Sequence, residues 1–241
     1  MGKLNHAFDS PEAKQRYVRR LFGTIAERYD LITVLLSFGR DRAWKRRLIA
    51  FAGVVPGTRV LDLACGTGDI AFEARAAGAT VFGLDVTPRM IALARRKSDG
   101  AAVHWLIGDM TGVPVAAGTF DAVTTGYGIR NVPDLQAALR EAHRVLRPGG
   151  RFCSLDFDRP SRRWLRAIVL GYLTTVGSTL GWALHRDPDT YRYIPASIRR
   201  YPGSQAVAAM MREAGFVDVQ VIPVFGGFMA IHVGSTVANE R

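Results

Sequence analysis

The chain has 241 residues, of which 48% are hydrophobic and 22% charged, and its formal net charge is +11 at neutral pH. A chain of this length and composition can bury one substantial core, so we expect a single domain over residues 1–241. Its two cysteines exclude a disulfide framework and a cysteine-rich zinc site, and no metal site is predicted. Residues 1–20 lack the apolar run of a signal peptide, so we expect a reducing, cytoplasmic setting.

Helical and strand patterns alternate along the chain. Residues 11–51 look helical and are expected to form an N-terminal helical cap (1–51) on a core of residues 52–241. In this core, strands are predicted at 59–64, 80–85, 102–107, 120–126 and 151–157, and helices at 69–77, 88–97 and 134–146. Such alternation predicts an α/β fold, with a mostly parallel sheet between helices. A helical stretch at 161–184, an irregular segment and a helix at 204–214 follow. Strands at 216–222 and 228–233 should form an antiparallel hairpin at the sheet edge.

Residues 167–184 carry no charge, and 18 uncharged positions reach the length at which a membrane-spanning helix must be considered. The larger apolar residues repeat at helical spacing, while Gly, Thr and Ser fall off that stripe. A spanning helix would also separate the last strands from the rest of the sheet. We therefore expect a core helix packed on the sheet, whose uncharged second face leaves room for an apolar substrate tail.

The most informative stretch is 60–69, where an apolar run gives way to Gly66-Thr67-Gly68 and then to a helix start. Glycines at these two positions remove the Cβ atoms that would keep a ligand away from the backbone. The free N–H groups of the helix start then point at whatever binds there. The turn is therefore predicted to bind a cofactor.

Carboxylates around this turn select the class of cofactor. The turn also fits the loose dinucleotide pattern G-x-G-x-x-G/A, in which a pyrophosphate meets the helix N-terminus. Asp62 and Asp69 flank the turn, however, and would repel a phosphate. Asp85 and Asp109 follow the next two strands. An ammonium, a sulfonium and a ribose match these carboxylates, which predicts S-adenosylmethionine. A dinucleotide-dependent oxidoreductase stays open as the alternative from another class.

Two clusters, residues 40–47 and 159–166, set tryptophan among arginines. This composition suits anionic lipid headgroups as well as it suits RNA, and a general preference for arginine on solvated faces is the alternative explanation of the charge. The chain lacks an Asn-Pro-Pro-Tyr-type run or a cysteine near the fourth strand, so nucleic acid is not an expected partner. We expect an anionic membrane surface instead, bound peripherally at the inner face of the membrane and more weakly as salt rises.

Several segments carry a resemblance to a known family. They are Tyr29-Asp30-Leu31, Leu61-Asp62-Leu63-Ala64 with Gly66-Thr67-Gly68-Asp69, the run from Gly126 to Val132, and the run from Arg144 to Gly150. On these segments the chain resembles the menaquinone and ubiquinone biosynthesis C-methyltransferases over nearly its whole length. The glycine turn is shared with many class I methyltransferases, whereas Tyr29-Asp30 and Gly-Ile-Arg-Asn-Val are more specific.

The resemblance implies a Rossmann-like class I methyltransferase that moves a methyl group from S-adenosylmethionine to a ring carbon of a polyprenylated quinol. Demethylmenaquinol is the first acceptor implied, and a ubiquinone-pathway benzoquinol is a further one. Cofactor contacts are implied at Thr67, Asp85, Asp109, Met110 and Gly126, beside the Asp62, Gly66 and Gly68 already derived from the turn. Another small aromatic compound or natural product is the alternative acceptor, and an oligomer stays open.

Arg130 and Asn131 follow the fourth strand at the carboxyl edge of the sheet, and they are the predicted catalytic residues. Arginine is too basic to act as a base, but it can stabilise a phenolate or orient a water that takes the proton. Asn131 can hold a quinol oxygen. The alternative is a turn before Pro133 with Asn131 as a helix cap.

The chain departs from the family pattern at Thr33, Asp41 and Asp156, where the resemblance leads one to expect Asn, His and Glu. These positions lie near the cap and the substrate side. We therefore expect them to bear on the identity of the acceptor more than on the reaction.

Overall fold

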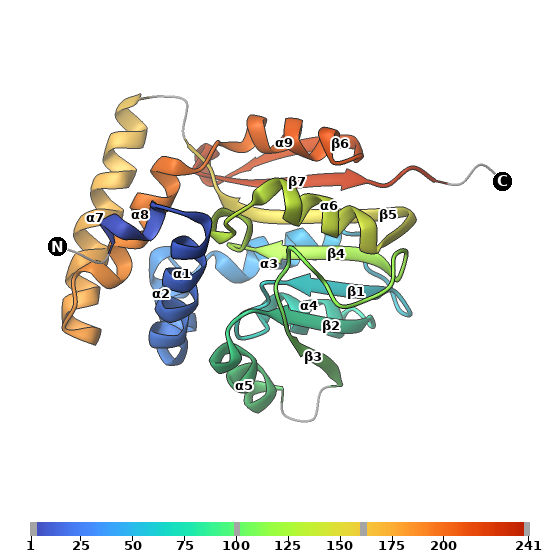
Figure 1. Cartoon of the computed structure of the whole chain (residues 1–241), viewed down its shortest axis with the longest axis horizontal. Coiled ribbons are helices and arrows are strands. Elements are labelled where there is room, and N and C mark those ends of the chain that lie inside the picture. The colour runs from blue at the N-terminus through green and yellow to red at the C-terminus, as the bar shows by residue number, and fades with distance from the viewer. Residues whose placement is uncertain (1–3, 99–101, 160–162, 239–241) are drawn as a thin grey trace.

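Seven strands form one sheet in the computed structural model, which describes residues 4–98, 102–159 and 163–238. The strand order is β3-β2-β1-β4-β5-β7-β6 (Figure 1). The strands are β1 (Arg59–Leu63), β2 (Thr80–Asp85), β3 (Val103–Ile107), β4 (Phe120–Gly126), β5 (Leu146–Phe157), β6 (Val217–Val224) and β7 (Met229–Ser235). β1 to β5 pair in parallel, and β7 runs antiparallel to both β5 and β6. The predicted mostly parallel sheet with an antiparallel edge hairpin is confirmed.

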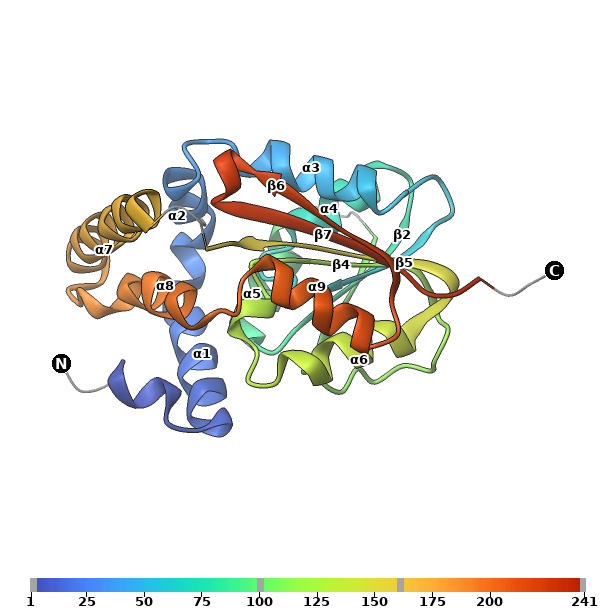
Figure 2. The ribbon, with the colours of Figure 1, turned by 90° about the horizontal axis from the view of Figure 1, so that it is seen from above.

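Helices cover both faces of this sheet. They are α1 (Pro11–Ile25), α2 (Tyr29–Leu36), α3 (Asp41–Phe51), α4 (Asp69–Ala76), α5 (Pro88–Lys97), α6 (Leu135–Val145), α7 (Arg163–His185), α8 (Asp189–Arg200) and α9 (Ser204–Glu213). Figure 2 shows α3 and α4 over one face, with α6 and α9 over the other. The central strands β1 and β4 are buried along nearly their whole length, as expected for parallel strands between two layers of helices.

The expected N-terminal cap consists of separate helices. Ser10 begins α1 by accepting a hydrogen bond from the Ala13 N–H with its hydroxyl. α1 packs against α5 and against the short turn at Ile129–Asn131, beyond the end of β4. α3, in contrast, packs on α4 and β5 and so belongs to the layer that covers the sheet. The division into a cap and a core domain stays a prediction.

β5 begins earlier than the sequence pattern indicates. Its first residue is Leu146 instead of residue 151, because the Pro148-Gly149-Gly150 segment bulges out of the strand without ending it. The pairing with β4 accordingly jumps from Leu146, opposite Phe120, to Arg151, opposite Ala122.

The predicted position of the helix over 161–184 is wrong. α7 does not pack on the sheet as a core helix but lies beside α8 at the end of the molecule (Figure 1). Leu173 and Gly177 are buried on its inner side, and Gly177 lies against Tyr191 of α8. The segment read as irregular is α8, which continues through Pro195. A proline inside a helix is usually a helix breaker, so the pattern concealed α8 and with it the packing partner of α7.

Candidate active site

A cavity of about 700 Å³ lies at the carboxyl ends of β1, β2 and β4. The strand order reverses between β1 and β4, and ligands of open α/β sheets bind at such a point. We call it the strand-end cavity. Its lining includes Gly66, Asp85, Met90, Asp109, Met110, Gly126 and Asn131, and α1 contributes Gln15, Val18 and Phe22. The predicted cofactor residues Gly66, Asp85, Asp109, Met110 and Gly126 are therefore brought together.

Asp85 ends β2 with its carboxylate beneath the glycine turn. One oxygen accepts a hydrogen bond from the Gly66 N–H at 2.9 Å, and the other accepts from the Thr87 N–H at 2.8 Å. Burial raises the pKa of Asp85, and the two backbone donors oppose that rise. Lone pairs remain on both oxygens, so the side chain can still accept hydrogen bonds from ligand hydroxyls.

Asp109 lies on the opposite wall and is shared between its own loop and α1. One oxygen accepts from the backbone and hydroxyl of Thr111, and the other accepts from the Gln15 amide. Lys14, the neighbour of Gln15, donates to the carbonyl oxygens of Arg130 at 3.2 Å and Val132 at 2.5 Å. Burial lowers the pKa of Lys14 to about 8, and the Arg130 charge adds to this effect. α1 is thereby attached as a roof over the strand-end cavity.

The two glycines of the turn have different roles. Gly66 lines the strand-end cavity and has φ +56°, a left-handed conformation that glycine adopts without strain. Gly68 is absent from that lining. A Cβ on Gly68 would lie 2.5 Å from the Trp105 ring, so this glycine is needed for packing and for its φ of +91°. The expectation that both glycines clear space for a ligand therefore has a structural basis only at Gly66.

Asp62 and Thr67 lie apart from the strand-end cavity. Asp62 is fully buried within β1, where it accepts a hydrogen bond from the Thr124 hydroxyl at 2.9 Å. Burial raises its pKa to about 7. Thr67 borders a smaller adjoining pocket with Lys45, and its hydroxyl donates to Asp30 at 2.5 Å. Their assignment as direct cofactor contacts stays a prediction.

A network of lysines and carboxylates, which the sequence reasoning missed, surrounds the turn. The Lys45 side chain is 6% exposed, and its ammonium lies 2.5 Å from Asp41 and 2.8 Å from Asp69. Burial alone would lower the pKa of Lys45, but the Asp69 and Asp41 carboxylates outweigh that effect and hold it above its ordinary value. Lys97 pairs with Asp69 and with Asp30. Asp69 is thus neutralised by two lysines, although the sequence pattern places it among the carboxylates that attract a cationic cofactor.

The scarcity of lysine is a signal in the sequence that could have revealed this network. The chain has only four lysines among 32 basic residues. Three of them, Lys14, Lys45 and Lys97, make the contacts just described, and Lys3 lies outside the described residues. A lysine provides a compact charge with three rotatable donors, which the planar arginine fork does not. Lysine in an arginine-rich chain therefore marked positions where that geometry is required.

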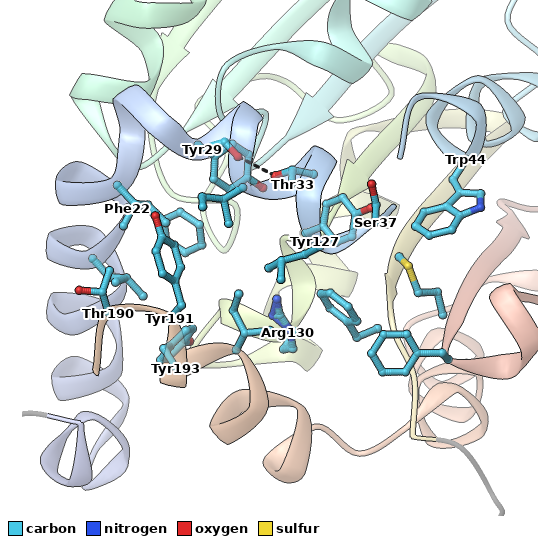
Figure 3. A pocket seen from close by; sticks show the side chains of 18 of the residues that line it. Phe22, Tyr29, Thr33, Ser37, Trp44, Tyr127, Arg130, Thr190, Tyr191 and Tyr193 are labelled. Carbon is cyan, nitrogen blue, oxygen red and sulfur yellow. Dashed lines mark hydrogen bonds between the residues drawn. The ribbon is translucent and has the colours of Figure 1, made fainter. Parts of the chain in front are cut away.

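A second cavity, of about 730 Å³, adjoins the first, and we call it the apolar cavity (Figure 3). Phe22, Tyr29 and Tyr127 line both cavities and form the wall between them. Burial raises the pKa of Tyr29 to about 12, so the phenol of this residue is neutral at physiological pH. The remaining lining is mostly aromatic and aliphatic and includes Leu21, Ile25, Ile32, Thr33, Leu36, Trp44, Phe157, Tyr191, Tyr193, Phe225 and Phe228.

Arg130 is the one charged residue among the described residues that line the apolar cavity. Figure 3 places it between Tyr193 on one side and Trp44 on the other. Its side chain is 4% exposed, and its Nε atom lies 3.4 Å from the Asp156 carboxylate. Asp156 also accepts from the Arg130 N–H, at 3.1 Å. Burial raises the pKa of Asp156, and the Arg130 charge opposes that rise.

Asn131 and Tyr127 are fixed by neighbouring groups. Asn131 donates from its side-chain amide to the Tyr127 carbonyl oxygen at 2.8 Å, and it lines the strand-end cavity. The alternative in which Asn131 caps a helix is wrong, because Asp134 caps α6 through the Ala137 N–H. The Tyr127 hydroxyl donates to Asp41 at 2.6 Å. Two of the three family departures, Asp41 and Asp156, are therefore buried partners of Tyr127 and Arg130, while Thr33 lines the apolar cavity.

The strand-end cavity fits S-adenosylmethionine better than a dinucleotide. Among its described lining residues are two carboxylates, Asp85 and Asp109, and no lysine or arginine. A pyrophosphate would meet no cation there, whereas a sulfonium and an ammonium would meet a negative potential. Met90 and Met110 add a polarizable apolar wall on which an adenine can pack.

Comparisons with known proteins point the same way. A family model described as the ubiE/COQ5 methyltransferase family matches residues 10–236. A demethylmenaquinone methyltransferase of Thermus thermophilus is 43% identical over 89% of this chain and 99% of its own length. A ubiquinone/menaquinone biosynthesis C-methyltransferase of Rubrivivax gelatinosus is 40% identical over 95% of this chain and 90% of its own.

Solved structures confirm the predicted Rossmann-like methyltransferase fold. An S-adenosylmethionine-dependent methyltransferase of Thermotoga maritima superposes with a TM-score of 0.65 at 19% identity, covering 90% of this chain and 99% of that one. A similar enzyme of Aquifex aeolicus gives a TM-score of 0.59 at 18% identity, over 80% and 89% of the two chains. At these identities the likeness concerns the fold alone.

Replacing Asp85 by alanine tests the strand-end cavity as the cofactor site. Loss of a charged acceptor should weaken S-adenosylhomocysteine binding by ~1.5–3 kcal/mol, roughly ten- to a hundredfold. Titration calorimetry gives the affinity, and thermal melting shows whether the variant is folded. Glu213→Ala, an exposed change on α9, is the matched control and should bind normally. Unchanged affinity in folded Asp85→Ala would remove this residue from the site.

The buried carboxyl of Asp62 predicts a pH dependence of stability. Its pKa is about 7 in the folded protein and near the ordinary value of 3.8 in the unfolded chain. Between these values only the folded protein holds the proton, so the free energy of unfolding falls as pH rises. Asp62→Asn should reduce this slope by up to about 1.4 kcal/mol per pH unit. Urea unfolding at pH 5, 6 and 7 measures the slope.

The exposed carboxylate of Asp218 provides the control for this measurement. Asp218→Asn should leave the slope of stability against pH as it is in the unmodified protein. A slope that Asp62→Asn does not change would show that Asp62 ionises in the folded protein as it does in the unfolded chain.

Proposed function

This chain belongs to the ubiE/COQ5 methyltransferase family, and we propose that it methylates a ring carbon of a polyprenylated quinol, with demethylmenaquinol as the first candidate. The chain is an S-adenosylmethionine-dependent methyltransferase. The observation that carries the choice of acceptor is the apolar cavity, which shares one wall with the strand-end cavity and contains a single charged lining residue among those described. An aromatic ring with a hydrocarbon tail and ring hydroxyls matches that lining.

In this proposal the strand-end cavity holds the cofactor and α1 covers it. S-adenosylmethionine, when bound, supplies an electrophilic methyl group on a sulfonium. Asp85 and Asp109 provide acceptors for the ribose and the positive charges, and Gly66 and Gly126 allow the ligand to approach the backbone. Phe22, Tyr29 and Tyr127 keep water from the boundary between the cavities. These residues position the methyl donor and exclude water, which are the main requirements of methyl transfer.

Arg130 is proposed to act on the acceptor. A ring carbon becomes nucleophilic when the adjacent hydroxyl loses its proton, and the resulting phenolate needs a cation nearby. The Arg130 guanidinium lies in the apolar cavity and cannot itself take a proton. Asp156 pairs with the guanidinium and does not itself line the cavity. The Phe157 ring packs against the guanidinium, with its centre 5.0 Å from the guanidinium carbon. Asn131 is proposed to hold a quinol oxygen, with its amide oriented by the Tyr127 carbonyl.

We further propose that the protein works in the cytoplasm, peripherally at an anionic inner membrane surface, because a polyprenylated acceptor resides in the bilayer. The net charge of +11 favours such a surface. The two arginine-tryptophan clusters do not present their tryptophans equally. Trp44 is 8% exposed and lines the apolar cavity, whereas Trp164 is 59% exposed. Residues 160–162 of the second cluster lie outside the described residues.

The acceptor is tested by incubating the protein with labelled S-adenosylmethionine and lipid extracts from a strain that lacks quinone methylation. Mass spectrometry should show the label on the quinone ring of a prenylated product. Label on another aromatic compound in the extract, with none on the quinone, would contradict the proposed acceptor. Heat-denatured protein in the same extract measures non-enzymatic transfer.

Arg130→Ala should lower single-turnover methyl transfer by ~100-fold or more, comparable to the loss of one donor at a charge-stabilising site. S-adenosylhomocysteine affinity should change little. The variant also leaves the Asp156 charge buried without its partner, which typically costs about 3–5 kcal/mol of stability. Arg130→Lys should recover little turnover, because a point charge does not reproduce the planar donor pair.

A double variant, Arg130→Met with Asp156→Leu, separates chemistry from stability. Replacing both partners by apolar groups of similar size removes the unpaired buried charge, so the melting temperature should recover in part. The Arg130 and Phe157 N–H groups, which donate to Asp156, lose their acceptor in this variant. Turnover should stay low, because the cation is still absent. A stable double variant with near-normal turnover would instead assign Arg130 a purely structural role.

A further inference from the structure

α7 presents an uncharged face to solvent. Its exposed residues recur at helical spacing, and no Asp, Glu, Lys or Arg occurs from 167 to 184. They include Trp164, Ile168, Gly171, Thr175, Thr179 and Trp182. Among the described residues, one helical window, Arg166–His185, is long and apolar enough to cross a membrane, and only 17% of it is buried. Exposed helix faces of water-soluble domains normally carry charge, so an uncharged exposed face indicates a binding surface.

α2 extends the same face. It runs antiparallel beside α7, since Phe38, just beyond the end of α2, stacks on Tyr172 at 5.6 Å and Arg28 donates to the Leu184 carbonyl at the other end. Figure 2 shows the two helices side by side. The large exposed side chains of this segment are all apolar: Leu31, Val34, Leu35 and Phe38. We call the exposed residues of α2 and α7, with Phe38, the docking face.

We propose that the docking face binds the surface of an anionic lipid bilayer, with α7 lying in the plane of the interface. Trp164 and Trp182 are 59% and 66% exposed, and 18 residues of helix separate them by about 27 Å. Tryptophan prefers the headgroup level of a membrane, so the two anchor both ends of the helix at one depth.

The inner side of α7 shows why the helix lies on the bilayer and does not cross it. Ser178 accepts a hydrogen bond from the Arg192 guanidinium of α8 at 2.9 Å, and Arg192 also pairs with Asp189. Gly181 approaches the Asp187 and Pro188 backbone too closely for a side chain. A spanning α7 would carry these charged groups into hydrocarbon or lose its packing against α8.

Arginines stand at both ends of the docking face. Arg28 and Arg186 are exposed where α2 begins and α7 ends, beside the exposed Asp187 and the exposed Glu27, which pairs with Arg89. Arg40 is exposed at the other end, with its guanidinium 6.0 Å from the centre of the Phe225 ring. Cations around an apolar surface are the arrangement that anionic headgroups favour, at about 1 kcal/mol per basic residue. The exposed arginines at these ends outnumber the exposed carboxylates, which favours an anionic bilayer over a second copy of the chain.

The docking face also adjoins the apolar cavity. Ile32 and Leu36 line that cavity from the inner side of α2, and Phe225 lines it while contacting Phe38 with ring centres 6.2 Å apart. A quinol ring would thus enter beside α2 while its tail stays in the bilayer. This last step rests on the proposed quinol acceptor, and the docking face gives the location of the membrane association proposed above.

Sedimentation with vesicles tests the docking face on the full-length protein. Phosphatidylcholine vesicles with added phosphatidylglycerol should bind the protein, and binding should fall as salt rises. The double variant Ile168→Glu/Thr175→Glu should bind roughly tenfold more weakly or worse, because it places two carboxylates against the lipid. Ala76→Glu/Ala92→Glu, exposed on α4 and α5, is the control of equal charge and should lose much less affinity. Equal losses of vesicle affinity in the two variants would show that the effect comes from net charge alone, and would overturn the proposed role of the docking face.

Tryptophan fluorescence gives an independent readout. Brominated lipids in the same vesicles should quench the protein, and Trp164→Phe/Trp182→Phe should remove most of that quenching, since Trp44 is buried and Trp105 is half-buried. Undiminished quenching in this variant would overturn the proposal. So would a dimer in the absence of vesicles that Ile168→Glu/Thr175→Glu dissociates, because a second copy would then cover the face.

Methyl transfer to a short-chain, water-soluble quinol separates this proposal from the proposed function. The docking-face variants should methylate it at the normal rate, because Ile168 and Thr175 line neither cavity. A normal rate together with lost vesicle binding supports the docking face. A wild-type protein that binds vesicles but methylates no quinol would contradict the proposed acceptor and leave the docking face in place.

Discussion

The buried ammonium of Lys45 is the interaction on which the arrangement of the site depends. Desolvating a lysine is costly, and only two close carboxylates, Asp41 on its own helix and Asp69 at the start of α4, offset that cost. Asp41 in turn accepts from the Tyr127 hydroxyl, and Tyr127 forms part of the wall between the cavities. One charge therefore fixes α3, the start of α4 after the glycine turn, and that wall with respect to one another.

The two cavities differ in potential although they are neighbours. The strand-end cavity is lined by carboxylates, while the apolar cavity has Arg130 as its charged lining residue among those described. Asp156 compensates Arg130 from outside the apolar cavity, so the pair is buried without placing a carboxylate against the acceptor. A cationic methyl donor and an acceptor that becomes anionic each meet complementary charge, and the neutral rings of Phe22 and Tyr29 stand between them.

The sheet was predictable because its strands are local patterns, with each apolar run ending at a turn signal. Asp85, Asp109 and Gly126 could be placed for the same reason, since parallel strands bring their carboxyl ends to one edge. The features that the sequence did not predict depend on contacts between residues that are far apart in the chain. Lys97 meets Asp30 from 67 residues away, and α8 was hidden by Pro195. Without α8 the sequence offered α7 only the sheet to pack on, which is why its position was wrong.

The attachment of α1 has a consequence for the timing of the catalytic cycle. Lys14 and Gln15 fasten this helix across the strand-end cavity through the carbonyl oxygens of Arg130 and Val132 and through Asp109. If the spent donor leaves past α1, these bonds have to break and re-form in every cycle. The Lys14 amine, with its pKa lowered to about 8, holds the roof less firmly as the medium becomes alkaline. The rate of donor exchange would then depend on two side chains of α1, Lys14 and Gln15, which lie outside the apolar cavity.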